Sequence, residues 1–227
     1  MQQIPLSPDL TSSAWFADDR WSDLVGFIFF SALAVWTVAE VPTLSVWLLP
    51  TFAHELFSAI AFVIRDRARA TAPSLTARAT AYGGTLVIVA FVHVSRLWRP
   101  EWLSRTTSVE AATVGTILWL VGSLVVVVSI WWLRHAFSIE PEARRIVTSG
   151  PYRFARHPIY SGYALQYIGL SLNYPTAALA LVMVAWVCFT LARIRFEERV
   201  LSQAFPEYID YKQTVGALGP RLLPVQH

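Results

Sequence analysis

Two charged stretches enclose one apolar block towards the C-terminal end of the chain. Residues 148–162 read TSGPYRFARHPIYSG, and residues 193–201 read RIRFEERVL. The block between them, residues 163–192, carries no charged side chain and is interpreted as the membrane-embedded part of one hydrophobic hairpin. Because charges are costly inside lipid, their concentration at both ends of one hydrophobic hairpin predicts a polar ligand held at the membrane surface. We expect a lipophilic second ligand to reach the same place from the bilayer.

The composition is that of a polytopic membrane protein. Of 227 residues, 55% are hydrophobic and 15% are charged, and the mean hydropathy is +0.48. Globular proteins carry about 25% charged residues, and here the deficit falls in long uncharged runs. The predicted fold class is all-α, with about five or six transmembrane helices and a C-terminal helical hairpin that frames a cofactor pocket.

Apolar segments near the length that crosses a bilayer mark the candidate helices. They are residues 24–39, 44–64, 79–97, 111–133, 159–173 and 176–196. Pro50 is expected to kink the second segment. If the first two segments form one broken span, the count falls from six to five. We divide the chain into N-terminal transmembrane helices, 1–133, and a cofactor-binding catalytic region with an amphipathic tail, 134–227.

Arginine placement predicts the orientation in the membrane. Residues 65–78, residues 134–158 and the tail after residue 192 are rich in arginine, and such loops stay cytoplasmic. We therefore expect the active site on the cytoplasmic side. The sequence pI of about 9.2 then reflects loops facing anionic lipid, not nucleic acid. Arginine far outnumbers lysine, of which Lys212 is the sole example, as is typical of a GC-rich bacterial genome. A bacterial inner membrane is expected.

The first charged stretch has the features of a ligand-binding turn. Gly150, followed by proline, favours a change of direction. Pro158 near the first position of a helix leaves His157 at the helix N-terminus, where free N–H groups can bind polar ligand atoms. Tyr152 and Tyr160 offer rings and hydroxyls for an adenine or a ribose. Alternatively, the arginines of this stretch only anchor the chain in the membrane and the tyrosines form an interfacial belt.

The second charged stretch adds carboxylates. Arg193 and Glu197 are four residues apart, so they share a helical face and can simply pair. The hairpin should bring Arg193, Glu197 and Glu198 close to His157. Such a pocket suits a zwitterionic adenosyl cofactor, since a carboxylate matches its ammonium and aromatic rings match its adenine. No metal site is expected, because the sequence has no His/Cys ligand cluster, and the single Cys188 is expected to be inert packing.

Together these motifs resemble the isoprenylcysteine carboxyl methyltransferase family and its relatives, the membrane phospholipid and small-molecule methyltransferases. The shared pattern begins with a Gly-x-Tyr turn, the run Arg-His-Pro-x-Tyr-x-Gly and an apolar hairpin. It continues with Arg-x-x-x-Glu-Glu-x-x-Leu, a tail in which Phe is followed by Glu-Tyr-x-x-Tyr, and a final proline. The matching positions are Gly150, Tyr152, 156–162, Arg193, Glu197, Glu198, Leu201, Phe205, Glu207, Tyr208, Tyr211 and Pro224. The resemblance covers about residues 134–224.

The resemblance implies an integral membrane methyltransferase with S-adenosyl-L-methionine as its cofactor. Its acceptor would be a lipophilic or prenylated molecule, favoured as an isoprenylcysteine-like carboxylate, that enters from the bilayer. The implied cofactor contacts are Ile146, Val147, Tyr152, His157, Pro158, Tyr160 and Glu197. Arg193 corresponds to a substrate-binding arginine, which can hold a carboxylate through two hydrogen bonds. Glu198 is a candidate base, as is His157, for an amine or thiol acceptor.

Two departures from the family bear on the acceptor. The family's His-x-Leu-Val run is replaced by Arg-Arg-Ile-Val at residues 144–147, and an upstream glutamine has no clear counterpart near Phe137 and Ser138. Both weaken the assignment of a protein prenylcysteine more than that of the cofactor.

Other readings remain open at this stage. One is a phospholipid N-methyltransferase or small-thiol S-methyltransferase. Another is an NADPH-dependent membrane sterol or enone reductase, although such enzymes usually carry Asn-Tyr where this chain has His-Pro-Ile-Tyr. A third is a non-catalytic membrane protein. Membrane lipids are expected partners, nucleic acid is not, and the sequence does not indicate an oligomeric state. The ionisable residues His54, Glu55, His93 and Arg96 fall within apolar segments and have no assigned role, though the last two share a helical face that suits a substrate entrance.

Overall fold

The fold is mostly helical, as predicted. The computed structural model describes residues 19–39, 48–72, 74–98 and 106–221. Its elements are α1 (Asp19–Ala39), α2 (Leu48–Ile64), β1 (Ala70–Thr71), α3 (Leu75–Trp98), α4 (Val109–Leu133), β2 (Glu142–Ala143), the 3-10 helix η2 (Gly150–Arg153), α5 (Pro158–Asn173), α6 (Ala177–Ala204) and α7 (Tyr208–Thr214). The departure from an all-α fold is one short antiparallel pairing, in which β1 residue Ala70 lies opposite β2 residue Ala143.

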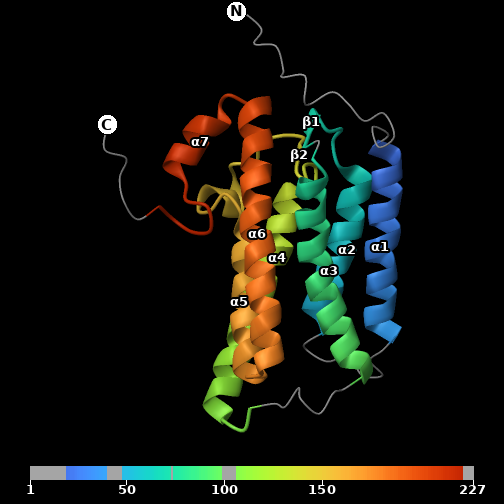
Figure 1. Ribbon diagram of the computed structural model, residues 1–227, viewed down its shortest axis with the longest axis vertical. Coiled ribbons are helices and arrows are strands. Elements are labelled where there is room, and N and C mark those ends of the chain that lie inside the picture. The colour runs from blue at the N-terminus through green and yellow to red at the C-terminus, as the bar shows by residue number, and fades with distance from the viewer. Residues whose placement is uncertain (1–18, 40–47, 73, 99–105, 222–227) are drawn as a thin grey trace, which may run out of the picture.

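The long helices α1 to α6 run in alternating directions (Figure 1). The connections that carry β1, β2 and η2 gather at one end of the bundle, together with α7. The arginine-rich segments therefore share one end, which agrees with the orientation inferred from arginine placement. That this end faces the cytoplasm stays a prediction.

Within the described residues, α1, α4 and α6 are each long and apolar enough to cross a membrane by length and composition. α2 is apolar but shorter, at 17 residues. α1 and α2 pack against each other as separate helices, so they are not one broken span (Figure 1). Pro50 lies in the first turn of α2 as the structure describes it, where a missing N–H costs little. Residues 44–47 of the predicted segment lie outside the described residues, so the kink at Pro50 stays a prediction.

α6 extends further than predicted. It ends at Ala204 and not at Phe196, so Arg193 and both glutamates of the second charged stretch lie on one continuous helix. With 28 residues, the helix is about 42 Å long, which exceeds the roughly 30 Å of a hydrocarbon core. Its charged last turns can therefore project into the membrane surface. The predicted amphipathic tail, 197–211, divides into the end of α6 and the short helix α7.

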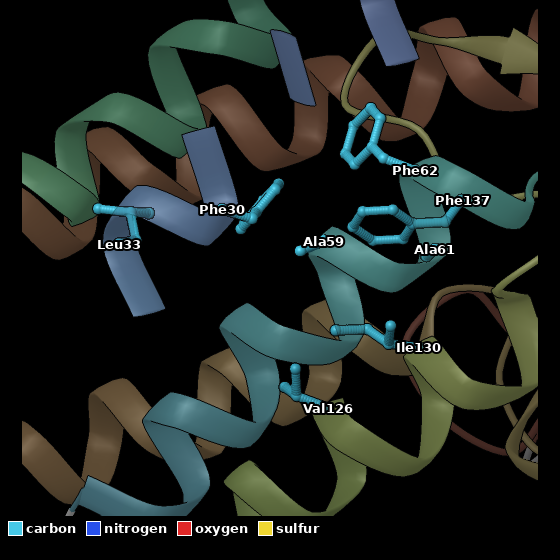
Figure 2. Packing of buried hydrophobic residues seen from close by; sticks show 8 residues of the cluster. All are labelled: Phe30, Leu33, Ala59, Ala61, Phe62, Val126, Ile130 and Phe137. Carbon is cyan, nitrogen blue, oxygen red and sulfur yellow. The ribbon is translucent and has the colours of Figure 1, made fainter. Parts of the chain in front are cut away.

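An apolar cluster joins the N-terminal helices to α4 (Figure 2). Its buried members are Phe30, Leu33, Ala59, Ala61, Phe62, Val126, Ile130 and Phe137. The Phe62 ring stacks on Phe30 with centroids 5.8 Å apart and meets Phe137 edge-on at 5.6 Å. Because Phe137 follows α4, this cluster also fixes the start of the segment that leads to the charged stretch before α5.

α4 and α5 meet through four glycines, which we term the glycine seam: Gly115 and Gly122 on α4, and Gly162 and Gly169 on α5. A Cβ added at Gly122 would lie 2.5 Å from the Gly162 carbonyl oxygen, and one at Gly115 would lie 2.7 Å from the Gly169 carbonyl oxygen. Small residues let helix backbones approach closely in membrane proteins. The seam therefore sets the position of α5 against α4.

The predicted C-terminal hairpin is splayed. α5 packs mainly on α4, whereas α6 packs mainly on α3, and α5 and α6 make few contacts with each other. On α3, Gly83 and Gly84 face the ring of Phe189 from α6. The two helices of the hairpin are therefore held by different partners, and single side chains link them, such as Tyr160 to Glu197 at the charged end and Tyr167 to Trp186 further along.

Candidate functional site

A sharp turn places the first charged stretch. Gly150 has a φ of +60°, a left-handed conformation that favours glycine. His157 is the N-cap residue of α5, and Pro158 occupies the first helical position. The predicted turn and the predicted helix start are both confirmed.

His157 lies between two carboxylates from α6. Its Nδ1 is 3.5 Å from Glu197 Oε2, and its Nε2 is 3.3 Å from Glu198 Oε1. The two charged stretches therefore meet in space, as predicted. Burial lowers the pKa of His157, but hydrogen bonds and charges from Glu197 and Glu198 outweigh this effect and hold the pKa above its usual range. The imidazolium form is thus favoured.

Glu197 connects α5 with Arg193. Its Oε1 accepts a hydrogen bond from the Tyr160 hydroxyl at 2.7 Å and another from Arg193 Nε at 2.7 Å. The Tyr160 ring stacks on the His157 ring with centroids 5.6 Å apart. The side chains of Arg193 and Glu197 remain 13% and 18% accessible, so both keep surface for a ligand.

Arg193 also keeps hydrogen-bond donors. Its Nη2 donates to the Ser138 carbonyl at 3.0 Å, and its Nη1 makes no hydrogen bond to any residue that the structure describes. The Arg193 guanidinium lies 5.6 Å from the Tyr160 ring centroid. An anion arriving beside Tyr160 would find free guanidinium N–H groups.

Glu198 is the hub of an ion-pair network. Arg156 Nη2 lies 2.7 Å from Glu198 Oε1, and Lys212 Nζ lies 2.7 Å from Oε2. With His157 as a third cationic neighbour, both carboxylate oxygens are occupied. A carboxylate held by three cations has little tendency to take up a proton. This geometry favours a structural role for Glu198 over the predicted role as a base.

Residues 215–218, here the C-terminal strap, cover the start of α5. The Arg156 N–H donates to the Gly216 carbonyl at 2.9 Å, and the His157 N–H donates to the Ala217 carbonyl at 2.9 Å. The Ser161 hydroxyl donates to the Leu218 carbonyl at 2.6 Å. The His157 N–H, which the sequence predicted to be free for a ligand, is therefore occupied by the protein itself.

Comparison with known proteins identifies this part of the chain. Residues 111–208 match the model of the phospholipid methyltransferase family. Residues 111–208 are a phospholipid methyltransferase-family region. The resemblance predicted from the motifs is confirmed for this region, which holds Arg156, His157, Tyr160, Arg193 and both glutamates of the site.

Individual relatives are each similar over part of this chain. The chain is 35% identical to the cobalt-zinc-cadmium resistance protein CzcN of Cupriavidus metallidurans over 60% of this chain and 62% of the relative. It is 30% identical to the nickel-cobalt-cadmium resistance protein NccN of Alcaligenes xylosoxydans xylosoxydans over 61% of each chain. It is 39% identical to protein-S-isoprenylcysteine O-methyltransferase B of Arabidopsis thaliana over 36% of this chain and 43% of the relative. The chain thus spans about three fifths of the first two relatives.

Two residues implied as cofactor contacts pack beside the site. Within the methyltransferase-family region, Ile146 contacts a buried apolar cluster that includes Val200 and Phe205. Val147, the next residue, is half-buried. The cluster includes residues from the last turns of α6, so Ile146 packs beside the helix that carries the glutamates.

Tyr152 and Pro158, also implied as cofactor contacts, are buried at the turn before α5. The Tyr152 hydroxyl lies 3.4 Å from the Ser129 carbonyl of α4, to which it donates, and the Tyr152 carbonyl accepts from the Tyr211 hydroxyl. Burial is the largest cause that raises the pKa of Tyr152, so its hydroxyl stays protonated. These contacts hold the turn between α4 and α7.

Sequence reasoning assigned no role to three groups that build the site, the side chains of Arg156 and Lys212 and the carbonyl of Ser138. Arg156 binds Glu198 and the carbonyl of Lys212, and Lys212 itself binds Glu198. Arg156 was visible as the arginine of the Arg-His-Pro motif. Lys212 carried a weaker signal, as the lone lysine of the chain near the Tyr-x-x-Tyr pair. The role of the Ser138 carbonyl could not be recognised in the sequence, because every residue has a backbone carbonyl.

The unassigned ionisable residues of the N-terminal helices differ in their contacts. His54 Nε2 lies 2.6 Å from the Tyr163 hydroxyl of α5. Glu55 accepts a hydrogen bond from Thr37 of α1 at 3.0 Å. His93 and Arg96 fall on α3, but their side chains lie outside the described part of the chain. Likewise Pro224, the last position of the family pattern, lies outside the described residues.

Proposed function

We propose that this protein is an integral membrane methyltransferase that uses S-adenosyl-L-methionine and acts on a lipophilic carboxylate of the isoprenylcysteine type. The observation that carries the proposal is the convergence of Arg193, Glu197, His157 and Tyr160 in a methyltransferase-family region, at one end of apolar helices. When bound, the cofactor supplies an electrophilic methyl group. We further propose a bacterial inner membrane, with this end of the bundle on the cytoplasmic side.

The donor set fits a zwitterionic adenosyl cofactor. Glu197 Oε2 has His157 as its nearest charged neighbour, at 3.5 Å, so it can accept from the ammonium of the cofactor. The stacked His157 and Tyr160 rings offer aromatic surface for the adenine. The backbone N–H of His157 is taken by the C-terminal strap, so it is not available to the cofactor carboxylate, which needs another donor.

Arg193 is suited to hold the methyl acceptor. Its Nη1 donors are unpaired among the described residues, and a guanidinium binds a carboxylate through two parallel hydrogen bonds. Glu197 Oε1 fixes the other edge of the same guanidinium at 2.7 Å. A carboxylate held there is oriented beside Tyr160, and orientation together with the exclusion of water accelerates group transfer.

The geometry favours a carboxylate over an amine or thiol acceptor. An amine or thiol must lose a proton, which requires a base close to it. His157 lies between two carboxylates that favour its protonated form, and Glu198 is held by three cations, so neither is suited to that role. A carboxylate needs no base. The family match and the names of the methyltransferase relatives support methyl transfer over the reductase and non-catalytic readings.

The test measures cofactor binding and methyl transfer separately in the purified full chain. We expect calorimetric binding of S-adenosyl-L-methionine and of its demethylated product, and transfer of labelled methyl to S-farnesylcysteine in preference to phosphatidylethanolamine or a small thiol. Arg193→Ala should lower turnover about tenfold or more with little change in cofactor affinity, because a hydrogen bond to a charged group is lost. Arg193→Lys should restore turnover only in part, because a lysine lacks the planar fork.

A matched control is Arg195→Ala, which removes an exposed arginine two residues further along α6. This change should leave turnover and cofactor affinity unaltered. Wild-type turnover in Arg193→Ala would exclude this residue from the active site. No binding of S-adenosyl-L-methionine, together with tight NADPH binding, would favour the reductase reading.

A further inference from the structure

One face of α5 continues the aromatic surface of the site into the helix bundle. His157, Tyr160, Tyr163 and Tyr167 are three or four residues apart, so they lie along one helical face. The first two belong to the charged cluster described above. The Tyr163 and Tyr167 rings stack with centroids 6.1 Å apart and planes 10° apart, and Tyr167 meets Trp186 of α6 edge-on at 4.6 Å. A row of aromatic rings therefore runs from the charged cluster into the bundle, and its far members Tyr167 and Trp186 are buried.

Tyr163 receives a polar partner from a distant part of the chain. The Tyr163 hydroxyl lies 2.6 Å from His54 Nε2 on α2, and the two rings are nearly perpendicular with centroids 5.7 Å apart. The His54 ring is itself held edge-on by Phe30 of the buried apolar cluster, at 6.1 Å. His54 is fixed by α1 and α2, outside the region that matches the family model, residues 111–208. This pair is therefore a feature of the chain's own N-terminal helices.

The Tyr163 hydroxyl lies next to the charged cluster that holds the free N–H groups of Arg193. Tyr163 lies one turn after Tyr160 on the same face of α5, and the Arg193 guanidinium lies 5.6 Å from the Tyr160 ring centroid. His54 and Tyr163 are both half-buried despite their place among the helices, so they retain surface for a ligand. α5 and α6 make few contacts with each other overall, and beyond Tyr163 the buried Tyr167 and Trp186 meet between them.

We propose that Tyr163 is a second anchor for the acid group of the methyl acceptor and that His54 is the residue that positions it. The inference rests on the proposed function, since it names a further specificity-determining residue for that reaction. A neutral imidazole has one donor and one acceptor nitrogen. When His54 Nε2–H donates to the phenol oxygen, the Tyr163 O–H is free to donate to a carboxylate beside Arg193. Tyr167 and Trp186 are buried against each other, and the stacking of Tyr167 on Tyr163 holds the Tyr163 ring in place from that side.

The test is direct binding, so it does not depend on turnover. The full chain in lipid nanodiscs is saturated with S-adenosylhomocysteine, and calorimetry measures the affinity for N-acetyl-S-farnesylcysteine and for its carboxamide. Wild type should prefer the carboxylate. Tyr163→Phe should weaken carboxylate binding about tenfold or more, since a hydrogen bond to a charged group is lost, and leave carboxamide binding nearly unchanged. His54→Phe should shift the same preference less, and His54→Gln, which keeps a side-chain N–H, should recover part of it.

Thr37→Val is the matched control. It removes another buried hydrogen bond between helices, from Thr37 to Glu55 at 3.0 Å, and it should leave the preference for the carboxylate intact. Unchanged S-adenosylhomocysteine affinity shows that a variant is folded. If Tyr163→Phe does not fold, the two His54 variants carry the same comparison.

Distinct outcomes separate the inference from the proposed function. Equal losses for carboxylate and carboxamide in Tyr163→Phe, or no loss in that folded variant, would overturn the inference alone. Binding of S-adenosylhomocysteine by wild type without any preference for the carboxylate would overturn the inference and the acceptor class, while methyl transfer would stand. Failure of wild type to bind S-adenosylhomocysteine at all would overturn the proposed function and the inference with it.

Discussion

α5 meets its two neighbours in opposite ways. Against α4 it packs backbone to backbone along the glycine seam, where no room remains even for a methyl group. Towards α6 it makes few direct contacts, and single side chains form the links, such as Tyr160 to Glu197 at 2.7 Å and Tyr167 to Trp186 with ring centroids 4.6 Å apart. The same helix is thus fixed on one side and open to a ligand on the other.

The difference separates two tasks. Glycines hold helices together without a hydrophobic driving force, because lipid is as apolar as the helix surface and packing must supply the attraction. Such an interface has no space for a ligand. Side chains that reach across between α5 and α6 leave surface on Arg193 and Glu197, and they carry the charges that a zwitterionic ligand needs. Changes on the two sides of α5 should therefore have different effects.

The largest effect is expected for Glu198→Gln. The change leaves Arg156, His157 and Lys212 without their shared anionic partner, and breaking a buried ion pair costs about 3–5 kcal/mol. The C-terminal strap should loosen, because the Arg156 side chain also donates to the Val215 carbonyl of the strap. Calorimetry should show a large loss of S-adenosylhomocysteine affinity, and thermal unfolding should show a lower Tm. Glu207→Gln, at an exposed position, is the control. Affinity equal to that of the control would mean that the network does not shape the site.

A smaller effect of a different kind is expected for Gly122→Ala on the seam. The added Cβ would lie 2.5 Å from the Gly162 carbonyl oxygen and 2.8 Å from the Gln166 nitrogen, and backbone atoms cannot move aside cheaply. Overpacking of this kind costs about 1–3 kcal/mol. The Tm should fall while the folded fraction still binds S-adenosylhomocysteine. Gly219→Ala, where a Cβ meets nothing within 4 Å, should leave the Tm unchanged. Equal Tm values for the two variants would show that the glycine seam can accommodate an added methyl group.

The smallest effect is a pH dependence from His157. The two carboxylates raise its pKa in the folded protein, so its contribution to stability is complete below the ordinary value of about 6.5 and is lost as the pH rises through the folded pKa. The Tm of wild type should therefore decline from about pH 6.5 upwards more steeply than that of His157→Gln. Thermal unfolding of both proteins over this range is the measurement. Parallel curves would mean that the imidazole is neutral between its carboxylates.

The sequence predicted one side of this comparison better than the other. Uncharged runs located the long helices, because lipid excludes charge, and the Arg-His-Pro and Arg-x-x-x-Glu-Glu motifs located the charged cluster. The end of α6 was placed too early, since Arg195 and Arg199 look like the edge of a membrane segment, yet arginine is a good helix former outside lipid.

Features that depend on distant pairings were not predicted. The glycines of α4 and α5 each recur after seven residues, but the sequence does not state that these two pairs face each other. The His54–Tyr163 contact joins residues 109 positions apart. The C-terminal strap uses backbone carbonyls, which every residue possesses, so no side-chain pattern marks it.

The glycine seam also constrains how this protein can change over generations. Any amino-acid replacement that follows from one nucleotide change in a glycine codon adds at least a Cβ. At Gly115, Gly122, Gly162 and Gly169 that atom has nowhere to go. Exposed apolar positions such as Val121 and Leu124 of α4 can exchange among aliphatic residues at little cost. Descendants of this gene should therefore accumulate differences on the outer faces of α4 and α5 while the line between them stays nearly invariant.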